Sequence, residues 1–492
     1  MVIRFQSNYI TPLLCTASAA AAGYYFFPFI HIFAAAAIII ILIIAFCFFR
    51  VLSMLDNRFS DNLYPKLRLI SICLAAAAAG FILGTFTGAA GQNNINFGLP
   101  ENNITAVEGV LLEDPRVLPG GSVMALISLK RCAGENVRVS SSGEITLFFP
   151  SETSLKLREF GRGTTVFAEG NLRSSDRGYS FSAVSLHITK TAPAIERMRT
   201  GIRLNLINRF EKHSWGGLAL ALLVGIRDNL DVNLTAVYRD AGLSYILALS
   251  GMHLAVITAL IAFVLKKPLG LKGALITGAV IICLYCFLVG PMPSLIRSAI
   301  MYLLGICTIL FALPKKSISI LCLSFLIQII LTPAAGNSLS FILSYLALLG
   351  IIVTSRQVSS LLSGKIPDFI LQPLSLSCGA FLATAGICSF SFGTIAPIGI
   401  IAGLFIVPLT TLFMVGSIIW LLFDFISLSF ILSYPLSWIY KLMEIVSSLA
   451  GFIPGIKGNP VLILIISVVL IISIAVLDYR RRTNLLKLEP FL

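Results

Sequence analysis

The sequence predicts a polytopic α-helical membrane protein, with about 12 spans and a small inserted β-barrel of the OB type on the outer face. Only 12% of its 492 residues are charged and 57% are hydrophobic, whereas a soluble domain carries roughly 25% charged residues. Apolar runs of about 20 residues, the length that crosses a bilayer, recur along the chain. One polar segment lacks such runs. We therefore expect N-terminal transmembrane helices at 1–90, the barrel at 100–190, interfacial helices at 191–242, a second transmembrane domain at 243–480 and a basic cytoplasmic tail at 481–492.

The candidate spans follow from the apolar runs in chain order. The weakest of them is 426–450, because Pro435, Lys441 and Glu444 give it a partly interfacial character. The expected spans are 8–28, 30–52, 67–89, 243–265, 271–290, 294–313, 316–332, 339–355, 367–388, 395–422, 426–450 and 459–478.

Basic residues cluster in alternate connections between these spans. Lys266 and Lys267 follow the fourth run, and an Arg-Arg-Arg tripeptide at 480–482 follows the last. The positive-inside rule places such clusters in the cytoplasm. With twelve spans, both termini are then cytoplasmic and residues 90–242 lie outside. If 426–450 did not cross, the arginine tripeptide would fall on the wrong side.

The polar segment 100–190 contains five short stretches rich in β-branched and aromatic residues, separated by turn residues. Five short strands suit a small closed barrel of the OB type, which binds single-stranded nucleic acid through basic and aromatic side chains. The opposite interpretation is that the aromatic side chains fill the barrel and the charges are only solvated, because residues 98–200 hold 12 basic and 11 acidic residues. The basic candidates for DNA contact are Lys130, Arg131, Arg173 and Arg177, and the aromatic candidates for stacking are Phe148, Phe149, Tyr179 and Phe181.

Residues 192–242 hold a basic stretch over 192–213 and two further stretches that are each too short or too charged to cross a membrane. We expect a basic amphipathic helix over 192–213 along the outer interface. A helical hairpin should follow at the membrane face, with Asp231 as an N-cap and Gly242 as a helix terminator.

The apolar run 241–260 carries Ser250, Gly251 and His253 near its middle. Polar groups at that depth are costly and commonly line a cavity or a pathway. A nucleophile–base pair is a second interpretation, although the glycine that precedes the serine of a nucleophile elbow is absent. The third is structural, with the serine bonded to its own helix and the histidine packed between helices.

Two further apolar segments contain polar side chains. "VGPMPSLIRSAIMY" (289–302) places Arg297 about one turn inside a span, where it either extends outward to the interface or faces a central cavity and meets phosphates. "PAAGNSLSFILSYLALLG" (333–350) places Ser340 and Ser344 four residues apart, so that they line one face or mediate helix packing.

Cysteine and histidine usage gives no sign of a cofactor. Nine of the ten cysteines lie in apolar segments, and four histidines are scattered along the chain. We expect no disulfide framework, no metal site and no cofactor.

These segments resemble the ComEC family, the DNA-internalisation competence proteins of bacterial inner membranes. The family pattern around S-G-x-H matches "LLVGIRDNLDVNLTAVYRDAGLSYILALSGMHLAVI", and "PMPSLIRSAIM" and the segment 333–350 match two later family motifs. A barrel after a few spans also fits the family. Many members end in a nuclease domain with an H-x-H-x-D-H motif, which this sequence lacks, so we do not expect an enzyme. The matching positions are Gly225, Leu230, Asp240, Gly242, Leu243, Ser250, Gly251, His253, Pro293, Ser294, Arg297, Pro333, Ser344 and Tyr345.

The resemblance implies conduction of single-stranded DNA across the cytoplasmic membrane during natural transformation. It also implies partners: single-stranded DNA, membrane lipids, a separate DNA-capture protein, a nuclease and a cytoplasmic helicase motor. Three alternatives stay open at this stage: a transporter of another solute, a scaffold for such a nuclease or helicase, and an intramembrane hydrolase that uses Ser250 and His253. The expected pathway residues are Asp240, Ser250, His253, Arg297, Ser340 and Ser344.

Overall fold

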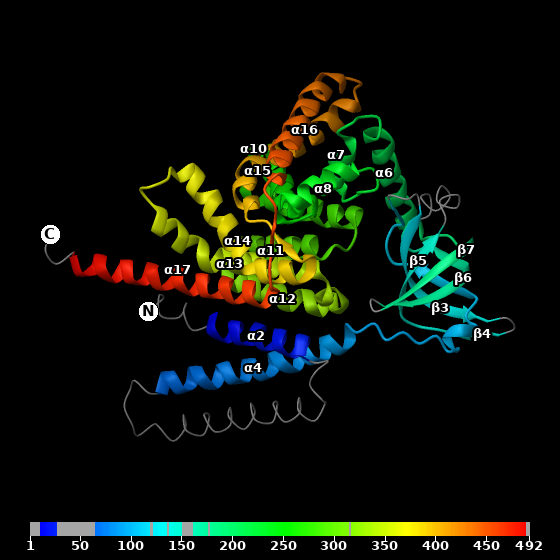
Figure 1. Ribbon diagram of the computed structural model, residues 1–492, viewed down its shortest axis with the longest axis horizontal. Coiled ribbons are helices and arrows are strands. Elements are labelled where there is room, and N and C mark those ends of the chain that lie inside the picture. Colours follow the sequence, from blue (N-terminus) through cyan, green and yellow to red (C-terminus); the bar gives the residue numbers. More distant parts are fainter. Residues whose placement is uncertain are drawn as a thin grey trace.

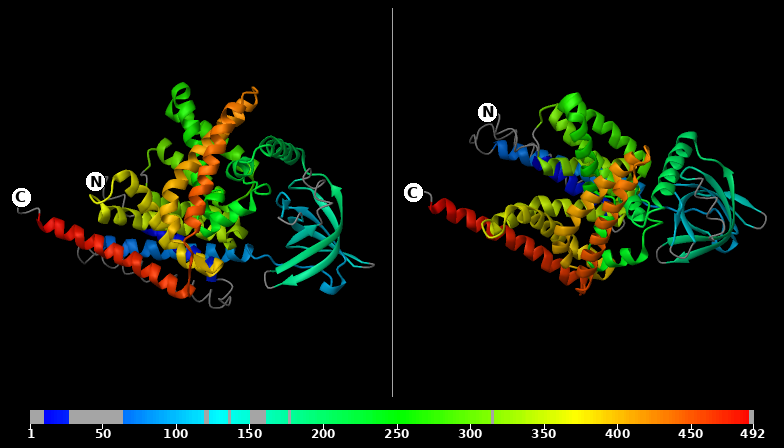
Figure 2. Two further views of the ribbon diagram at one scale, coloured as in Figure 1. Left: turned by 45° about the horizontal axis from the view of Figure 1, so that its top comes forward. Right: turned by 90° about the horizontal axis from the view of Figure 1, so that it is seen from above.

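The structure, a computed structural model, describes residues 10–26, 64–118, 122–134, 137–149, 161–175, 178–313 and 316–488. A helical body forms most of the molecule, and a β-barrel lies at one end of it (Figures 1 and 2). The longer helices are α2 (Ile10–Phe26), α4 (Tyr64–Ala90), α6 (Ala194–Phe210), α10 (Gly251–Val289), α11 (Pro293–Leu310), α12 (Ser317–Leu331), α13 (Leu339–Leu362), α14 (Asp368–Phe392), α15 (Ile398–Asp424), α16 (Phe430–Gly451) and α17 (Pro460–Leu488).

Five strands close into the barrel. The strand β1 pairs with both β3 and β6, so the sheet returns on itself, and β5 pairs in parallel with β7 while the other pairs are antiparallel. Alternate side chains point inward and form one buried apolar core. This arrangement confirms the small OB-like barrel. The strands are β1 (Ala106–Leu111), β3 (Val123–Ala133), β5 (Glu144–Phe149), β6 (Thr165–Ser175) and β7 (Gly178–Lys190), with the short β2 (Arg116–Val117) and β4 (Arg138–Ser140) beside β3.

Among the described residues, seven helices are long and apolar enough to cross a membrane: Ile72–Ala90, α10, α11, α13, α14, α15 and Pro460–Asp478. The apolar α12 is shorter, and α16, the weakest predicted span, is not in this group. The predicted span 30–52 lies outside the described residues. The protein is thus a polytopic membrane protein, and the number of twelve spans stays a prediction.

The helix α10 bends back on itself at its middle. Pro268 precedes Gly270, whose φ of 66° interrupts the helix. A Cβ placed on Gly278 would lie 3.9 Å from Ile261 Cγ2, so residues on either side of the break face each other. Two antiparallel halves result, as the predicted spans 243–265 and 271–290 require. The first predicted helix starts too early, however, because the backbone is extended at Ala248 and Ser250 and α10 begins only at Gly251.

The short helices α7 (Gly216–Val224) and α8 (Val232–Asp240) lie in the stretch where the helical hairpin is predicted. Asp231 caps α8 by accepting a hydrogen bond from the backbone of Asn233 at 2.8 Å, and Gly242 follows α8 with a φ of 70°. All nine residues of α7 are buried in the largely apolar core that also includes α15, and the expected position at the membrane face stays a prediction. The sequence of α7, GGLALALLV, is apolar on every side, which is typical of a buried helix.

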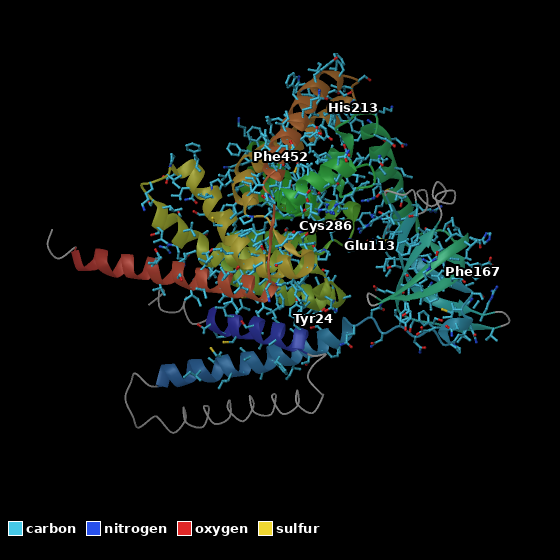
Figure 3. All side chains as sticks on the ribbon, in the orientation of Figure 1. Tyr24, Glu113, Phe167, His213, Cys286 and Phe452 are labelled. Atoms are coloured by element: carbon cyan, nitrogen blue, oxygen red, sulfur yellow. The ribbon has the colours of Figure 1, made fainter. Side chains whose placement is uncertain are left out.

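The N-terminal helices α2 and α4 pack closely against each other. Side chains of α2 join them to the rest of the body. Gly80 and Gly84 lie against the backbone of Thr16 and Ala20, so neither position has room for a side chain. The hydroxyl of Tyr24 donates to the carbonyl of Pro333, ahead of α13 (Figure 3). The N-terminal helices are therefore attached to the later membrane domain.

Candidate pathway site and nucleic-acid surface

A buried arginine lies where α10, α11 and α13 meet. Arg297 of α11 is 5% exposed, and its guanidinium lies 5.8 Å from the ring centroid of Tyr345 on α13. A Cβ placed on Gly251, the first residue of α10, would be 3.8 Å from Arg297 Nη2. The Nε and Nη1 atoms of Arg297 have no hydrogen-bond partner in the described part of the chain. An incompletely paired cation is thus enclosed between three helices.

Tyr345 is held in place by α12. Its hydroxyl donates to Oε1 of Gln328 at 2.9 Å, and Nε2 of Gln328 donates to the carbonyl of Pro293 at 2.8 Å. Gln328 is fully buried. We call Gly251, Arg297, Gln328 and Tyr345 the Arg297 cluster. The sequence interpretation missed Gln328, although a glutamine in the otherwise apolar run 317–331 is the kind of polar residue that marks a site in a membrane.

Ser250 and His253 lie together at the start of α10, where Ser250 is the N-cap residue. The Nδ1 atom of His253 accepts the backbone N–H of Ser250 at 3.1 Å, and Ser250 Oγ lies 3.1 Å from the same nitrogen. Since Nδ1 accepts, Nε2 carries the proton of the neutral ring. The ring is buried, and the backbone of Ile246 is a hydrogen-bond partner beside it. A catalytic triad orients its histidine with a carboxylate, and no carboxylate is within ion-pair distance of His253 among the described residues. The contact instead acts as a helix cap.

Three other predicted pathway residues lie away from this cluster's contacts. Asp240 is exposed at the end of α8 beside Arg239, 3.5 Å away. Ser340 is exposed on α13. Ser344 donates to the carbonyl of Phe341 in its own helix at 3.0 Å, which is the structural alternative for such a serine. Of the six predicted pathway residues, the structure therefore groups Ser250, His253 and Arg297 around the first residues of α10.

The structure contradicts two of the predicted aromatic DNA contacts, because the side chains of Phe149 and Phe181 point into the barrel. Phe149 and Phe181 are 2% and 0% exposed and belong to the barrel core, so they are not available to stack on bases. Phe148 is only partly buried and lies between Met124 of β3 and Ser182 of β7 in the sheet. Neighbouring residues of a strand point to opposite faces. Strand alternation therefore identifies Phe148, not Phe149, as the outward aromatic side chain.

The basic residues of β3 lie on the outer surface of the barrel. The register of β1 and β3 shifts between Glu108 and Gly109, which turns both Lys130 and Arg131 outward. Together with Lys190 they line a cavity of about 250 Å³ that also contains Glu108, Thr165 and Thr189. Arg173 is exposed farther along β6, and Arg177 lies outside the described residues.

A network of paired charges joins the barrel to the helices. Arg199 of α6 is 2% exposed and bonds both carboxylate oxygens of Asp114, at 2.6 and 3.0 Å, in the barrel. Its Nε donates to the carbonyl of Phe287 near the end of α10 at 3.0 Å, and Arg203 bonds Asp114 at 3.0 Å and Val289 at 3.2 Å. We call Asp114, Arg199 and Arg203 the arginine junction. Glu113, beside it in sequence, lies where the barrel meets the helical body (Figure 3).

The junction also sets the pKa of its carboxylate. Burial alone would raise the pKa of Asp114, but the hydrogen bonds from Arg199 and the charge of Arg203 hold it below its ordinary value. Burial lowers the pKa of Arg203, opposed by the charge of Asp114. The junction consequently needs both signs of charge.

A second cavity, of about 570 Å³, lies between α7, the connection from α7 to α8, and α16. Its lining includes Asp228, Asp231 and Glu444. A polyanion is repelled by such a lining, so this cavity is a poor candidate for a DNA pathway.

The fold and the site define a polytopic membrane protein with an inserted OB-like barrel and a buried cationic cluster among its helices. A family model described as "Competence protein" matches residues 222–481, which include the Arg297 cluster. The chain belongs to this family, the ComEC family of competence proteins.

Individual relatives agree with this assignment. "ComE operon protein 3" of Bacillus subtilis (strain 168) is 25% identical over 284 residues, which are 55% of this chain and 35% of that protein. An uncharacterized protein of Aquifex aeolicus (strain VF5) is 25% identical over 316 residues, 62% of this chain and 71% of the other. The match thus spans about a third of the length of the Bacillus relative. No solved structure matches.

Proposed function

We propose that this protein conducts single-stranded DNA across the cytoplasmic membrane during natural transformation, with the Arg297 cluster on the route. The observation that carries the proposal is Arg297 itself, 5% exposed, with two unpaired guanidinium nitrogens between α10, α11 and α13. A polyanion needs a polar route through about 30 Å of hydrocarbon. A buried ionisable residue in a membrane is by default a functional residue. Membership of a competence family agrees with this role.

The described conformation is closed at this point, under this proposal. Tyr345 lies over the guanidinium, and the start of α10 lies at its edge. A strand would pass only after α10 and α13 separate around Arg297. A single fixed cation suits transport, because many strong phosphate contacts would trap the strand.

The barrel would receive the strand on the outer face of the membrane. In support, it lies at the opposite end of the body from the α13–α14 connection (Figure 1), which carries Lys365 and follows Arg356. The positive-inside rule assigns such a connection to the cytoplasm. The strand would contact Phe148 by stacking, and Lys130, Arg131 and Lys190 through phosphates. A separate capture protein, nuclease and helicase motor would act before and after this step.

The test follows a fluorescent or radiolabelled strand in a naturally competent host that lacks this protein. DNA bound outside and DNA in the cytoplasm are counted separately, with wild type, Arg297→Gln or Arg356→Gln supplied on a plasmid. Loss of an arginine–phosphate contact of about 1.5–3 kcal/mol corresponds to roughly a 10- to 100-fold fall in import for Arg297→Gln. Arg356 is an exposed arginine on α13 and serves as the matched control, with import expected near wild type.

Captured DNA should stay unchanged in all strains. Normal cytoplasmic import in the deletion strain would refute the proposed function. Normal import with a well-expressed Arg297→Gln protein would remove the cluster from the route.

A further inference from the structure

We infer that the first turn of α10 and Arg297 form a binding site for one phosphodiester group. The inference rests on the proposed function for the identity of its principal ligand. It begins from two buried atoms with no hydrogen-bond partner in the described part of the chain, Nε and Nη1 of Arg297. Both are donors on a charged group. An unsatisfied buried donor is unfavourable, and more so when it is charged. What these atoms lack is an acceptor.

The positive charge of Arg297 and of the start of α10 also favours an anion at this place. A helix start carries a partial positive charge and N–H groups without intrahelical acceptors. Arg297 Nη2 lies 3.8 Å from the position of a Cβ on Gly251, the first residue of α10. No carboxylate is within ion-pair distance of Arg297 among the described residues, whereas the buried Arg199 has two. Two positive groups therefore face each other in a buried place.

A second arginine adds to the positive charge before α10. Arg227 donates to the carbonyl of Leu247 at 2.8 Å, three residues before Ser250. The positive character of this region thus comes from two side chains and the helix end. A single anion at the start of α10 would offset the charge of Arg297 and supply acceptors for its free nitrogens.

Phosphate fits these donors better than a carboxylate from the protein would. Helix N-termini bind phosphate through backbone N–H groups, and a guanidinium binds phosphate oxygens in pairs. Gly251 lets the start of α10 lie close to α11, because a side chain there would be 3.1 Å from Ser298 Oγ. Tyr345 and Gln328 fix one face of the guanidinium by the contacts described above. Each two-donor edge of the guanidinium includes Nη2, which lies beside Gly251, so the ligand would bind Nη2 together with one of the two unpaired nitrogens.

Phosphate groups reach this membrane protein from two sources, the nucleic acid and the lipids. The test therefore measures the thermal unfolding midpoint of the purified full-length chain with different probes at matched ionic strength. The probes are sodium phosphate, a short oligo-thymidylate, and the same strand with an uncharged methylphosphonate backbone. Nanodiscs of phosphatidylcholine alone are compared with nanodiscs that contain phosphatidylglycerol.

Wild type should be stabilised by several degrees by phosphate and by the charged strand, since a ligand that binds only the folded state raises its stability. The uncharged strand should have no such effect. Arg297→Gln should lose the shift, while Arg356→Gln keeps it. Without phosphate, Arg297→Gln should unfold at the same temperature as wild type or higher, because it removes an uncompensated buried charge. A merely structural arginine would give the opposite result.

Two further variants keep the test decisive if Arg297→Gln does not fold. Arg297→Lys retains the charge without the paired geometry and should keep only part of the shift. Gly251→Ala keeps the arginine but places a methyl group beside its guanidinium, and it should reduce the phosphate shift as well.

The site is refuted if wild type shows no shift, or if Arg297→Gln keeps the full shift. An Arg297-dependent shift with phosphatidylglycerol alone would make the ligand a lipid and refute the nucleic-acid source. Lost import in the deletion strain without any phosphate shift would refute this site and leave the proposed function. Normal import in the deletion strain together with an Arg297-dependent phosphate shift would refute the proposed function and leave this site.

Discussion

The protein buries arginines in two places, and it treats them differently. At the arginine junction, Arg199 is 2% exposed and its guanidinium is bound by Asp114, Glu196 and backbone carbonyls. In the Arg297 cluster, Arg297 is 5% exposed and has one hydrogen bond, at 3.5 Å to Ser298, with two nitrogens unpaired in the described structure. Both sites place a guanidinium at an end of α10, the junction at its C-terminal end and the cluster at its start.

The difference separates a structural role from a functional one. Carbonyls at a helix C-terminus favour a cation, whereas the N–H groups at a helix start repel it. The junction therefore combines an arginine with the helix end that suits it and adds carboxylates. The cluster combines an arginine with the end that does not suit it and adds none. Only the second arrangement gains from an anion that arrives from outside the chain.

The largest effect is expected from a variant that breaks the arginine junction. In Asp114→Ala, Arg199 and Arg203 lose their shared carboxylate while they remain buried, and we expect a loss of about 3–5 kcal/mol in the free energy of unfolding. Thermal or denaturant unfolding of the purified chain measures it. Glu113→Ala is the matched control: its partner Arg116 is 52% exposed, and such a surface pair is worth at most about 1 kcal/mol. Equal effects of the two variants would contradict the structural role of the junction.

Two adjacent aromatic residues give the same contrast within the barrel. Phe149→Ala empties a core position and should cost about 3–5 kcal/mol of stability. Phe148→Ala should change stability little and weaken binding of a single-stranded oligonucleotide by about 1–3 kcal/mol per stacked base. Unfolding and fluorescence-anisotropy titrations measure the two quantities on the same preparations. A Phe148→Ala protein that is unstable and binds normally would place Phe148 with the core.

These contrasts also mark how far the sequence predicts the molecule. The barrel was predictable, because strand alternation and turn residues are local, and the predicted 179–189 became Gly178–Lys190. The helices were predictable from hydropathy. The position of Ser250 was not, since nothing local distinguishes the middle of an apolar run from a helix start inside it. The partners of Arg297 were not predictable either, because Gly251, Gln328 and Tyr345 come from three segments that only the tertiary fold brings together.

A smaller effect is the pH dependence of stability, which should come from Asp114 of the arginine junction and not from Glu113 beside it. The pKa of Asp114 is lower in the folded chain than its ordinary value of 3.8. Its contribution to stability is therefore complete at neutral pH and is lost as the pH falls below about 4 toward the folded pKa. Wild type and Glu113→Ala should lose stability over this interval, and Asp114→Ala should lose less. Unfolding midpoints between pH 3 and 7 measure the effect, and parallel curves for all three proteins would exclude Asp114 as its source.

The smallest effect concerns the aromatic support of Arg297. Tyr345→Phe keeps the ring beside the guanidinium and removes the hydroxyl that donates to Gln328 at 2.9 Å. We expect a loss of about 1 kcal/mol in stability, the net value of one hydrogen bond, and less than a tenfold change in DNA import. Tyr302→Phe on α11, a partly buried tyrosine outside the cluster, is the control. If Tyr345→Phe destabilised the chain as strongly as Asp114→Ala, the Arg297 cluster would be a second structural junction, and the contrast between the two buried arginines would fail.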